Sequence, residues 1–302
     1  MKRKGFLKGL GVAASVLALT ATAACGSDDN GGSDDNADGG GTITLGIIPS
    51  WTDGLSVGYL WKNVLEQEGY DVEIEEVADA GLLYQGLADG SIDVYPSAWP
   101  EVTHAAYMEQ HGDALEDLGA YYEGAVLTMA VPEYTDIDSI ADLKDNADQF
   151  GGEIVGIEAG AGLTDATKNS VMPAYELDDD YTLVESSTTA MLAALSDAID
   201  NEEDIVVTLW RPFWANSEFP VKDLEDPEGA FGDPETLNAI ANADFSDEFP
   251  DVAEMMGNFK LSDDEYGGLE DIVVNEYGEG NEEEAIEAWL EDNPDFIDSL
   301  KG

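Results

Sequence analysis

Three tryptophans each follow a short apolar segment that is typical of a buried strand. Trp51 follows "TITLGIIPS", Trp99 follows "IDVYPSA" and Trp210 follows "DIVVTL". Because the face of an aromatic ring attracts cations, three indole rings could enclose a quaternary ammonium group. Stacking on a sugar is the other task for such rings, and it would require Asp, Asn and Arg close to the tryptophans. The residue types alone leave both ligands open.

Two further features could bind an anion. In "VGIEAGAGLTDATKNS", residues 155–170, a strand runs into a glycine-rich turn and then a helix. Glycines let backbone N–H groups approach a ligand, and a helix N-terminus favours negative charge. His104, five residues after Trp99, could donate a hydrogen bond to the same anion, although a helix-capping or surface role is the alternative. A cation cage beside an anion site fits a zwitterion with a trimethylammonium and a carboxylate.

The elements that must position these residues alternate between strand and helix from Thr42 onward. "TITLGIIP", "DVEIEEV", "IDVYPSAW", "AVLTMAVP" and "DIVVTLW" have strand character, and the segments between them have helical spacing. This alternation predicts an α/β fold with a mostly parallel sheet and helices on its faces. Ligands of such sheets bind at the carboxyl ends of strands, where the tryptophans fall. The last ninety residues are expected to be mostly helical.

The composition is strongly acidic, with 67 Asp and Glu against 11 Lys and Arg, and a net charge of -56 in 302 residues. Such a charge disfavours nucleic acid and anionic membrane surfaces as partners. The hydrophobic content of 43% indicates a folded protein with an acidic surface, which is typical of exposure to concentrated salt. No EF-hand loop, HExxH motif, GxGxxG spacing or Walker lysine is present, so no metal, nucleotide or other cofactor is expected.

The N-terminus predicts export and lipid attachment. A basic segment, "MKRKGFLKG", precedes an apolar stretch that is too short for a comfortable membrane span. "TAACGS" resembles a bacterial lipoprotein signal, although Thr22 stands where leucine is usual. The prediction is a signal peptide over 1–24, a lipidated Cys25 that anchors the chain to a membrane, and a flexible acidic linker over 25–41. Cys25 is the only cysteine, which excludes an intrachain disulfide.

From Thr42 to about Lys260 the sequence resembles the glycine betaine substrate-binding proteins of ABC transporters, a periplasmic-binding-protein type II family. The resemblance is carried by "GLLYQGLADGSIDVYPSAWPEVTH", "GIEAGAGLTDATK", "LVESSTTAMLAAL" and "VVTLWRPFWA". It implies an aromatic cage for the ammonium and a carboxylate site built from one histidine and backbone amides. On this sequence the implied ligand-binding residues are Trp51, Trp99, Trp210, His104, Gly162 and Leu163. Phe213 stands where relatives carry histidine, outside the cage.

The resemblance also implies two α/β lobes joined by two crossover strands, with "AVLTMAVP" and "DIVVTLW" as the expected crossovers. Lobe 1 would comprise 42–127 and 212–302, and lobe 2 would comprise 128–211. The implied protein is a monomeric, extracytoplasmic solute-binding lipoprotein, without enzymatic activity, that delivers a betaine osmolyte to an ABC permease. It would lie at the outer face of the cytoplasmic membrane or in the periplasm.

Two alternatives remain open at this point. A choline- or carnitine-binding protein of the same fold would use the same cage, but His104 and the turn at Gly162 argue against choline, which lacks a carboxylate. A secreted hydrolase on this scaffold would use carboxylate pairs or His104 as a base, and no nucleophile elbow in the sequence supports it.

Overall fold

A computed structural model describes residues 40–302. The predicted signal peptide, Cys25 and all but the last two residues of the predicted linker lie outside the described residues. None of the helices in this described part is long and apolar enough to cross a membrane.

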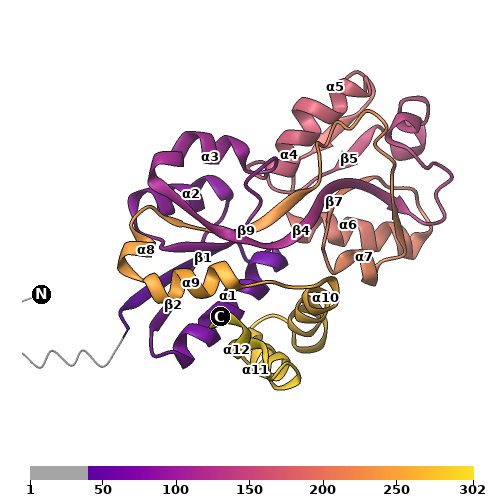
Figure 1. Cartoon of the computed structure of the whole chain (residues 1–302). Helices are drawn as coiled ribbons and strands as arrows, with labels where there is room; N and C mark the ends of the chain where they lie inside the picture. Colours follow the sequence, from indigo (N-terminus) through magenta and orange to yellow (C-terminus); the bar gives the residue numbers. More distant parts are fainter. Residues whose placement is uncertain (1–39) are drawn as a thin grey trace, which may run out of the picture. The chain divides into compact units, whose positions relative to one another are not determined.

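Within residues 40–302, nine strands form one mixed sheet in the order β2-β1-β3-β9-β4-β7-β5-β6, with β8 paired to β4 (Figure 1). They are β1 (Thr42–Ile47), β2 (Asp71–Glu76), β3 (Val94–Ala98), β4 (Leu115–Pro132), β5 (Glu153–Val155), β6 (Thr182–Val184), β7 (Val207–Arg211), β8 (Val221–Asp223) and β9 (Glu235–Asn242). The α/β fold that the sequence predicted is confirmed, but the sheet is mixed and not mostly parallel, because β4 pairs antiparallel with β7, β8 and β9, and β9 pairs antiparallel with β3.

The long strand β4 joins two sets of strands. Its first part pairs with β9, from Leu115 to Ala125, and its second part pairs with β7, from Val126 to Ala130. We call β2, β1, β3 and β9 the first strand group, and β7, β5, β6 and β8 the second strand group. Within each group the strands linked by helices are parallel, namely β1 with β2 and β3, and β5 with β6 and β7.

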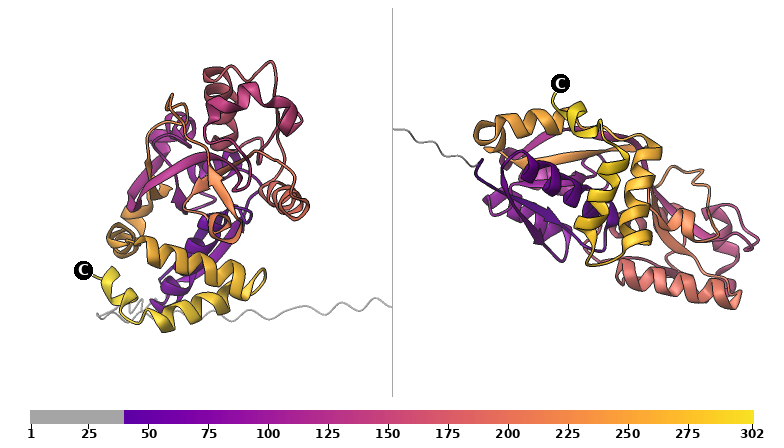
Figure 2. Two further views of the ribbon diagram at one scale, coloured as in Figure 1. Left: turned by 90° about the vertical axis from the view of Figure 1, so that its right-hand side faces the viewer. Right: turned by 90° about the horizontal axis from the view of Figure 1, so that it is seen from below.

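Helices cover the strands on both faces. In Figure 2, α10 and α11 lie beside α1, and α1 packs against β1, β2 and β3. The helices are α1 (Thr52–Gln67), α2 (Ala80–Asp89), α3 (Ala105–His111), α4 (Gly162–Ala166), α5 (Met172–Ala174), α6 (Thr188–Asn201), α7 (Ala215–Glu218), α8 (Phe245–Glu248), α9 (Pro250–Asn258), α10 (Asp263–Asp271), α11 (Glu282–Asp292) and α12 (Phe296–Leu300). Short 3-10 or π turns join several of them.

The return of the chain to the first strand group differs from the expectation. The segment "DIVVTLW" ends in β7, which pairs with β4 and β5, and β8 also pairs with the second half of β4. The chain therefore returns to the first group between Asp223 and Glu235 and continues as β9. The sequence did not predict β9, because its inward residues are mostly small and its region was interpreted as helical. The proposed lobes, 42–127 with 212–302 and 128–211, stay a prediction.

Pro173 lies where the helical segment after the glycine-rich turn changes its winding. Helix α4 continues into a π turn over Thr167–Val171, and α5 begins with Pro173 in its first turn. Since proline has no N–H to donate, it is tolerated at such a start. Trp61 and Trp289 are both buried in the core.

Candidate functional site

The six residues with predicted ligand contacts line a single pocket between the two strand groups. It has about 350 Å³ of empty space, part of which is open solvent at its mouth. The lining residues are Trp51, Asp53, Trp99, Thr103, His104, Leu127, Ile157, Ala161, Gly162, Leu163 and Trp210. Trp51, Trp99 and Trp210 stand at or just after the ends of β1, β3 and β7, as the sequence predicted. Their roles in binding stay predictions.

Each of the three indole rings is fixed by a different neighbour. The Nε1–H group of Trp99 donates to Asp53 Oδ2 over 3.2 Å, and that of Trp51 donates to Glu158 Oε2 over 3.3 Å. Trp210 stacks on Phe213, with ring centroids 3.9 Å apart. Rings that are already oriented lose little conformational entropy when a ligand arrives.

Phe213 therefore supports the pocket from behind and does not line it. Trp214 in turn packs edge-on against Phe213, with centroids 5.7 Å apart. Trp214 therefore packs behind Trp210 and Phe213. Phe213 places an aromatic ring under Trp210.

Among the described residues that line the pocket, Asp53 is the one acid, and it is only 3% exposed. Its carboxylate accepts hydrogen bonds from Ser97 Oγ, at 2.8 Å, and from the Trp99 indole. Ser97 also shares a hydrogen bond with the Tyr121 hydroxyl. Burial raises the pKa of Asp53, and these donors only partly oppose that effect. A negative charge at this position would be unpaired inside the protein and would attract a cation in the pocket.

His104 is prepared to donate a hydrogen bond. The backbone N–H of Trp99 donates to His104 Nδ1 over 3.2 Å, so Nδ1 carries a lone pair. Burial lowers the pKa of His104 to about 3, and the ring is therefore neutral near pH 7, with its proton on Nε2. This tautomer is assigned from the hydrogen bonds. The ring lines the pocket, and an Nε2–H group there suits an anionic oxygen.

The glycine-rich turn brings backbone amides to the same pocket. Helix α4 starts at Gly162, and Ala161 before it gives no side-chain cap, so the first N–H groups of the helix lack that partner. A Cβ atom on Gly162 would lie 1.9 Å from the Thr103 carbonyl oxygen. Only glycine permits this approach of the two segments. Gly162 and Leu163 line the same pocket as His104.

Two more buried carboxylates stand behind the pocket wall. Glu270, on α10, accepts a hydrogen bond from the Thr52 hydroxyl, and burial raises its pKa to about 8. Glu235, at the start of β9, accepts from the backbone N–H groups of Val102 and Thr103 and from the Thr103 hydroxyl. Glu235 thereby holds the turn that leads to His104.

Sequence reasoning missed several of these residues. Asp53 could have been found as an acid in the apolar first turn of a helix, directly after a candidate cage residue. Leu127 and Ile157 gave no signal, because they look like any apolar strand residue. Glu158 and Glu235 act across more than 100 positions of the sequence, and local spacing does not show such contacts.

The composition of the lining decides between the two ligands that tryptophans suggest. Sugar binding would require Asp, Asn and Arg around the rings. Asp53 is the only one of these types among the described residues that line the pocket. Within residues 40–302, no group of three or more His, Cys, Asp or Glu side chains is placed to hold a metal ion. The lining suits a small ligand with an apolar cationic end and an anionic end.

Comparison with known proteins agrees with this geometry. The family profile described as "Substrate binding domain of ABC-type glycine betaine transport system" matches residues 41–292. The chain belongs to this family. Over 158 residues, it is 35% identical to the glycine betaine/carnitine transport binding protein GbuC of Listeria monocytogenes. That match covers 51% of this chain, and the chain spans about half the length of that relative.

Two solved structures are similar over most of the chain. A glycine betaine/L-proline-binding protein, ProX, from Borrelia burgdorferi aligns with a TM-score of 0.80 and 32% identity, over 86% of this chain and 97% of its own. Lactococcal OpuAC, in its closed conformation complexed with glycine betaine, aligns with a TM-score of 0.79 and 28% identity, over 86% and 99%. The periplasmic-binding-protein-like fold of the chain is thereby established.

Proposed function

We propose that this chain captures glycine betaine or a related betaine outside the cytoplasm and delivers it to an ABC importer. One observation carries the proposal, namely that one pocket is lined by three tryptophans, Asp53, His104, Gly162 and Leu163. In this proposal the tryptophan rings and Asp53 attract the cation, while His104 and the Gly162–Leu163 amides bind the anion. Membership in a family of glycine betaine transport domains supports the same ligand class.

The ammonium would lie among Trp51, Trp99 and Trp210 in an aromatic cage. Each desolvated ring contributes about 1–2 kcal/mol of cation–π attraction. The carboxylate would accept hydrogen bonds from His104 Nε2 and from the two amides. Closure of the two proposed lobes, joined by the crossover segments, would complete the site in the manner of a hinge.

A choline- or carnitine-binding protein is the second candidate. Carnitine carries both charged groups, and a relative named for glycine betaine and carnitine transport is 35% identical to this chain over their matched region. Choline would leave His104 and the amides without an anionic partner, at a cost in affinity. No feature of the pocket favours the hydrolase alternative.

The remaining parts of the proposal concern the setting of the protein. We propose that Cys25 is the lipidated N-terminus of a monomeric lipoprotein, held at the outer face of the cytoplasmic membrane or in the periplasm. The acidic composition fits a cell in concentrated salt that imports betaine as an osmolyte. A melting temperature that rises from about 0.1 to about 2 M salt would support that setting, and a flat profile would contradict it.

Calorimetric titration of the full chain with glycine betaine, proline betaine, carnitine, choline and glycine tests the proposed function. We expect the betaines to bind more tightly than choline, and glycine, which lacks the methyl groups, to bind least. No binding of any betaine, or tighter binding of choline than of glycine betaine, would contradict the assignment.

A further inference from the structure

Glu158 stands at the start of the glycine-rich turn, three residues after β5, and its carboxylate accepts four hydrogen bonds. Two come from Thr188, at the start of α6 in the second strand group, from its backbone N–H at 3.0 Å and its hydroxyl at 2.9 Å. The other two come from the segment between β1 and α1. Ser50 Oγ donates over 3.0 Å and Trp51 Nε1 over 3.3 Å.

The turn makes other contacts with the first strand group beside these. The Tyr107 hydroxyl donates to the Gly160 carbonyl oxygen over 2.9 Å, and the Thr103 carbonyl lies against Gly162. The residues of the turn thus meet elements on both sides of the pocket. Glu158 is the member of the turn whose side chain bonds directly to a cage tryptophan.

We infer that Glu158 is a positioning residue that couples the orientation of Trp51 to closure of the pocket. The inference rests on the proposed function, because it assumes that the pocket opens to admit a betaine. Thr188 holds the carboxylate in place when the strand groups are apart. On closure, Ser50 and Trp51 reach it and complete its hydrogen bonds, and Trp51 is then fixed in the orientation that faces the ligand.

This arrangement acts after the ligand has entered, so its loss should change the dissociation rate constant more than the association rate constant. The donors are hydroxyl, indole and amide groups, and none is a cation. Their contribution should therefore depend little on salt, unlike that of an exposed ion pair.

Stopped-flow tryptophan fluorescence with glycine betaine, on the full chain, tests the inference. For Glu158→Gln we expect a dissociation rate constant about 10- to 30-fold higher, with the association rate constant changed less than about twofold. Ser50→Ala removes one cross-pocket donor and leaves Thr188 untouched, and it should raise the dissociation rate constant about threefold or more.

A matched control is Glu185→Gln. Glu185 directly follows β6 and pairs with Lys168 inside the second strand group, so its change should leave both rate constants as in the wild type. The melting temperature of the ligand-free chain is the second readout. If Glu158 only capped α6, Glu158→Gln would lower that temperature by several degrees, and the dissociation rate constant of Ser50→Ala would stay at the wild-type value.

Two failures are distinguishable. An unchanged dissociation rate constant in both Glu158→Gln and Ser50→Ala, with a wild type that binds glycine betaine, would overturn the role of Glu158 alone. A wild type that binds no betaine would overturn the proposed function and this role with it.

Discussion

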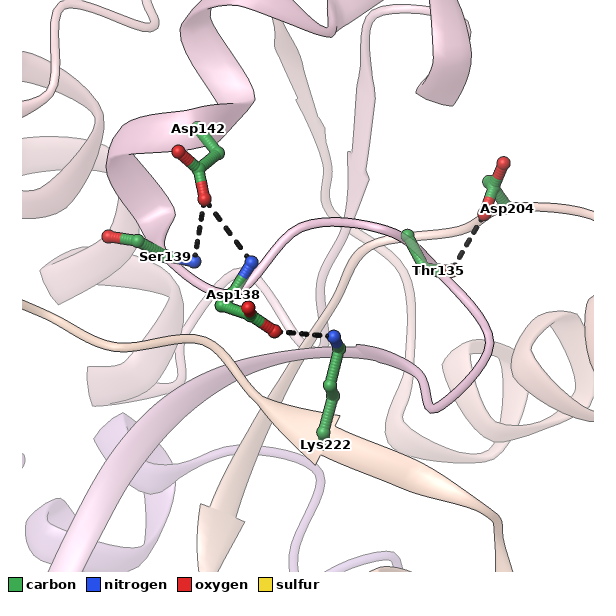
Figure 3. A network of polar contacts seen from close by, with 6 residues as sticks. All are labelled: Thr135, Asp138, Ser139, Asp142, Asp204 and Lys222. Atoms are coloured by element: carbon green, nitrogen blue, oxygen red, sulfur yellow. Dashed lines mark hydrogen bonds and ion pairs between the residues drawn. The ribbon is translucent and has the colours of Figure 1, made fainter.

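The carboxylates around the pocket and those of an outer network in the second strand group are stabilised in different ways. We call Asp53, Glu158, Glu235 and Glu270 the pocket carboxylates. The outer network, shown in Figure 3, centres on Asp138, whose carboxylate pairs with Lys222 Nζ at 2.6 Å while its side chain is 85% exposed. Among residues 40–302, which the structure describes, no lysine or arginine pairs with a pocket carboxylate, and their donors are hydroxyl, indole and backbone groups.

Most of the pocket carboxylates are costly to ionise, because they are buried and no cation among the described residues pairs with them. Three of the pocket carboxylates are almost fully buried, and burial raises the pKa of each of them. An ionised carboxylate without a cation is costly in such an environment. Of these carboxylates only Asp53 lines the pocket, where a positively charged ligand would be its counter-ion. Asp138 already has a cation beside it and is screened by water and salt. We call the pocket electrostatically incomplete, because among the described residues no cation pairs with its carboxylates. In the outer network, by contrast, Lys222 pairs with Asp138.

The largest expected effect distinguishes a pocket tryptophan from a core tryptophan. Trp99→Ala removes a ring that lines the pocket and that Asp53 holds, and we expect about a 1,000-fold loss of glycine betaine affinity in calorimetry. Trp61 packs edge-on against Phe259 in the core, 5.3 Å between centroids. Trp61→Ala should lower the unfolding free energy by about 3–5 kcal/mol and leave the affinity of the folded fraction nearly unchanged. Equal affinity losses in the two variants would contradict the proposal that the pocket tryptophans form an aromatic cage.

The next effect concerns stability and pH at Glu270, whose pKa burial raises to about 8. Between the ordinary glutamate pKa and pH 8, the native state binds a proton at this site that the unfolded state has lost. The contribution of Glu270 to the unfolding free energy therefore falls as pH rises from about 5 to about 8. Glu270→Gln should be relatively more stable than wild type by roughly 3 kcal/mol at pH 8 compared with pH 5. Denaturant unfolding at both pH values measures this, and parallel pH profiles of the two proteins would contradict it.

His104 should contribute to the anionic end of the pocket only. His104→Ala removes the Nε2–H donor, and a hydrogen bond to a charged group is worth about 1.5–3 kcal/mol. We expect glycine betaine affinity to fall about 10- to 100-fold, while any residual choline affinity hardly changes. Titration with both ligands checks this, and a similar loss for both would show that His104 is structural.

The smallest effect belongs to the outer network. Lys222→Met removes the partner of Asp138 but keeps much of the side-chain length. Exposed ion pairs contribute about 0.2–1 kcal/mol, so the unfolding free energy should fall by less than about 1 kcal/mol, and less still near 1 M salt. Betaine affinity should stay at the wild-type value. A loss of several kcal/mol, or one that persists at high salt, would mean that the two regions are not as different as described.

The sequence predicted those features that depend on local order along the chain. The tryptophans at the strand ends and the glycine-rich turn at Gly162 could be recognised in the sequence, because each lies at a boundary between two elements. The rule that parallel strands end at the same edge applies to Trp51 and Trp99, because β1 and β3 are parallel. It does not apply to Trp210, because β7 runs opposite to these strands, and only the structure places all three residues in one pocket. His104 was placed correctly at the start of a helix, but its neutral state with Nε2–H depends on the Trp99 amide, which only the structure places beside Nδ1.

Other features depend on contacts between distant segments. Strand β9 was missed because its pairing with β3 and β4 decides its conformation, and its own residues give a weak pattern. Glu158 meets Ser50 across 108 positions, and Glu235 meets Val102 across 133. In a chain with 67 acidic residues, no local rule marks these two as different from those on the surface.

The most direct test of the incomplete pocket needs no variant. Glycine betaine and 3,3-dimethylbutanoate have nearly the same shape and the same carboxylate, but the second has a neutral carbon in place of the ammonium nitrogen. Calorimetric titration of the wild-type chain with both ligands isolates the positive charge. If the tryptophans and Asp53 attract a cation, glycine betaine should bind at least about 100-fold more tightly. Equal affinities would show that the pocket selects shape and carboxylate alone, and would contradict the account.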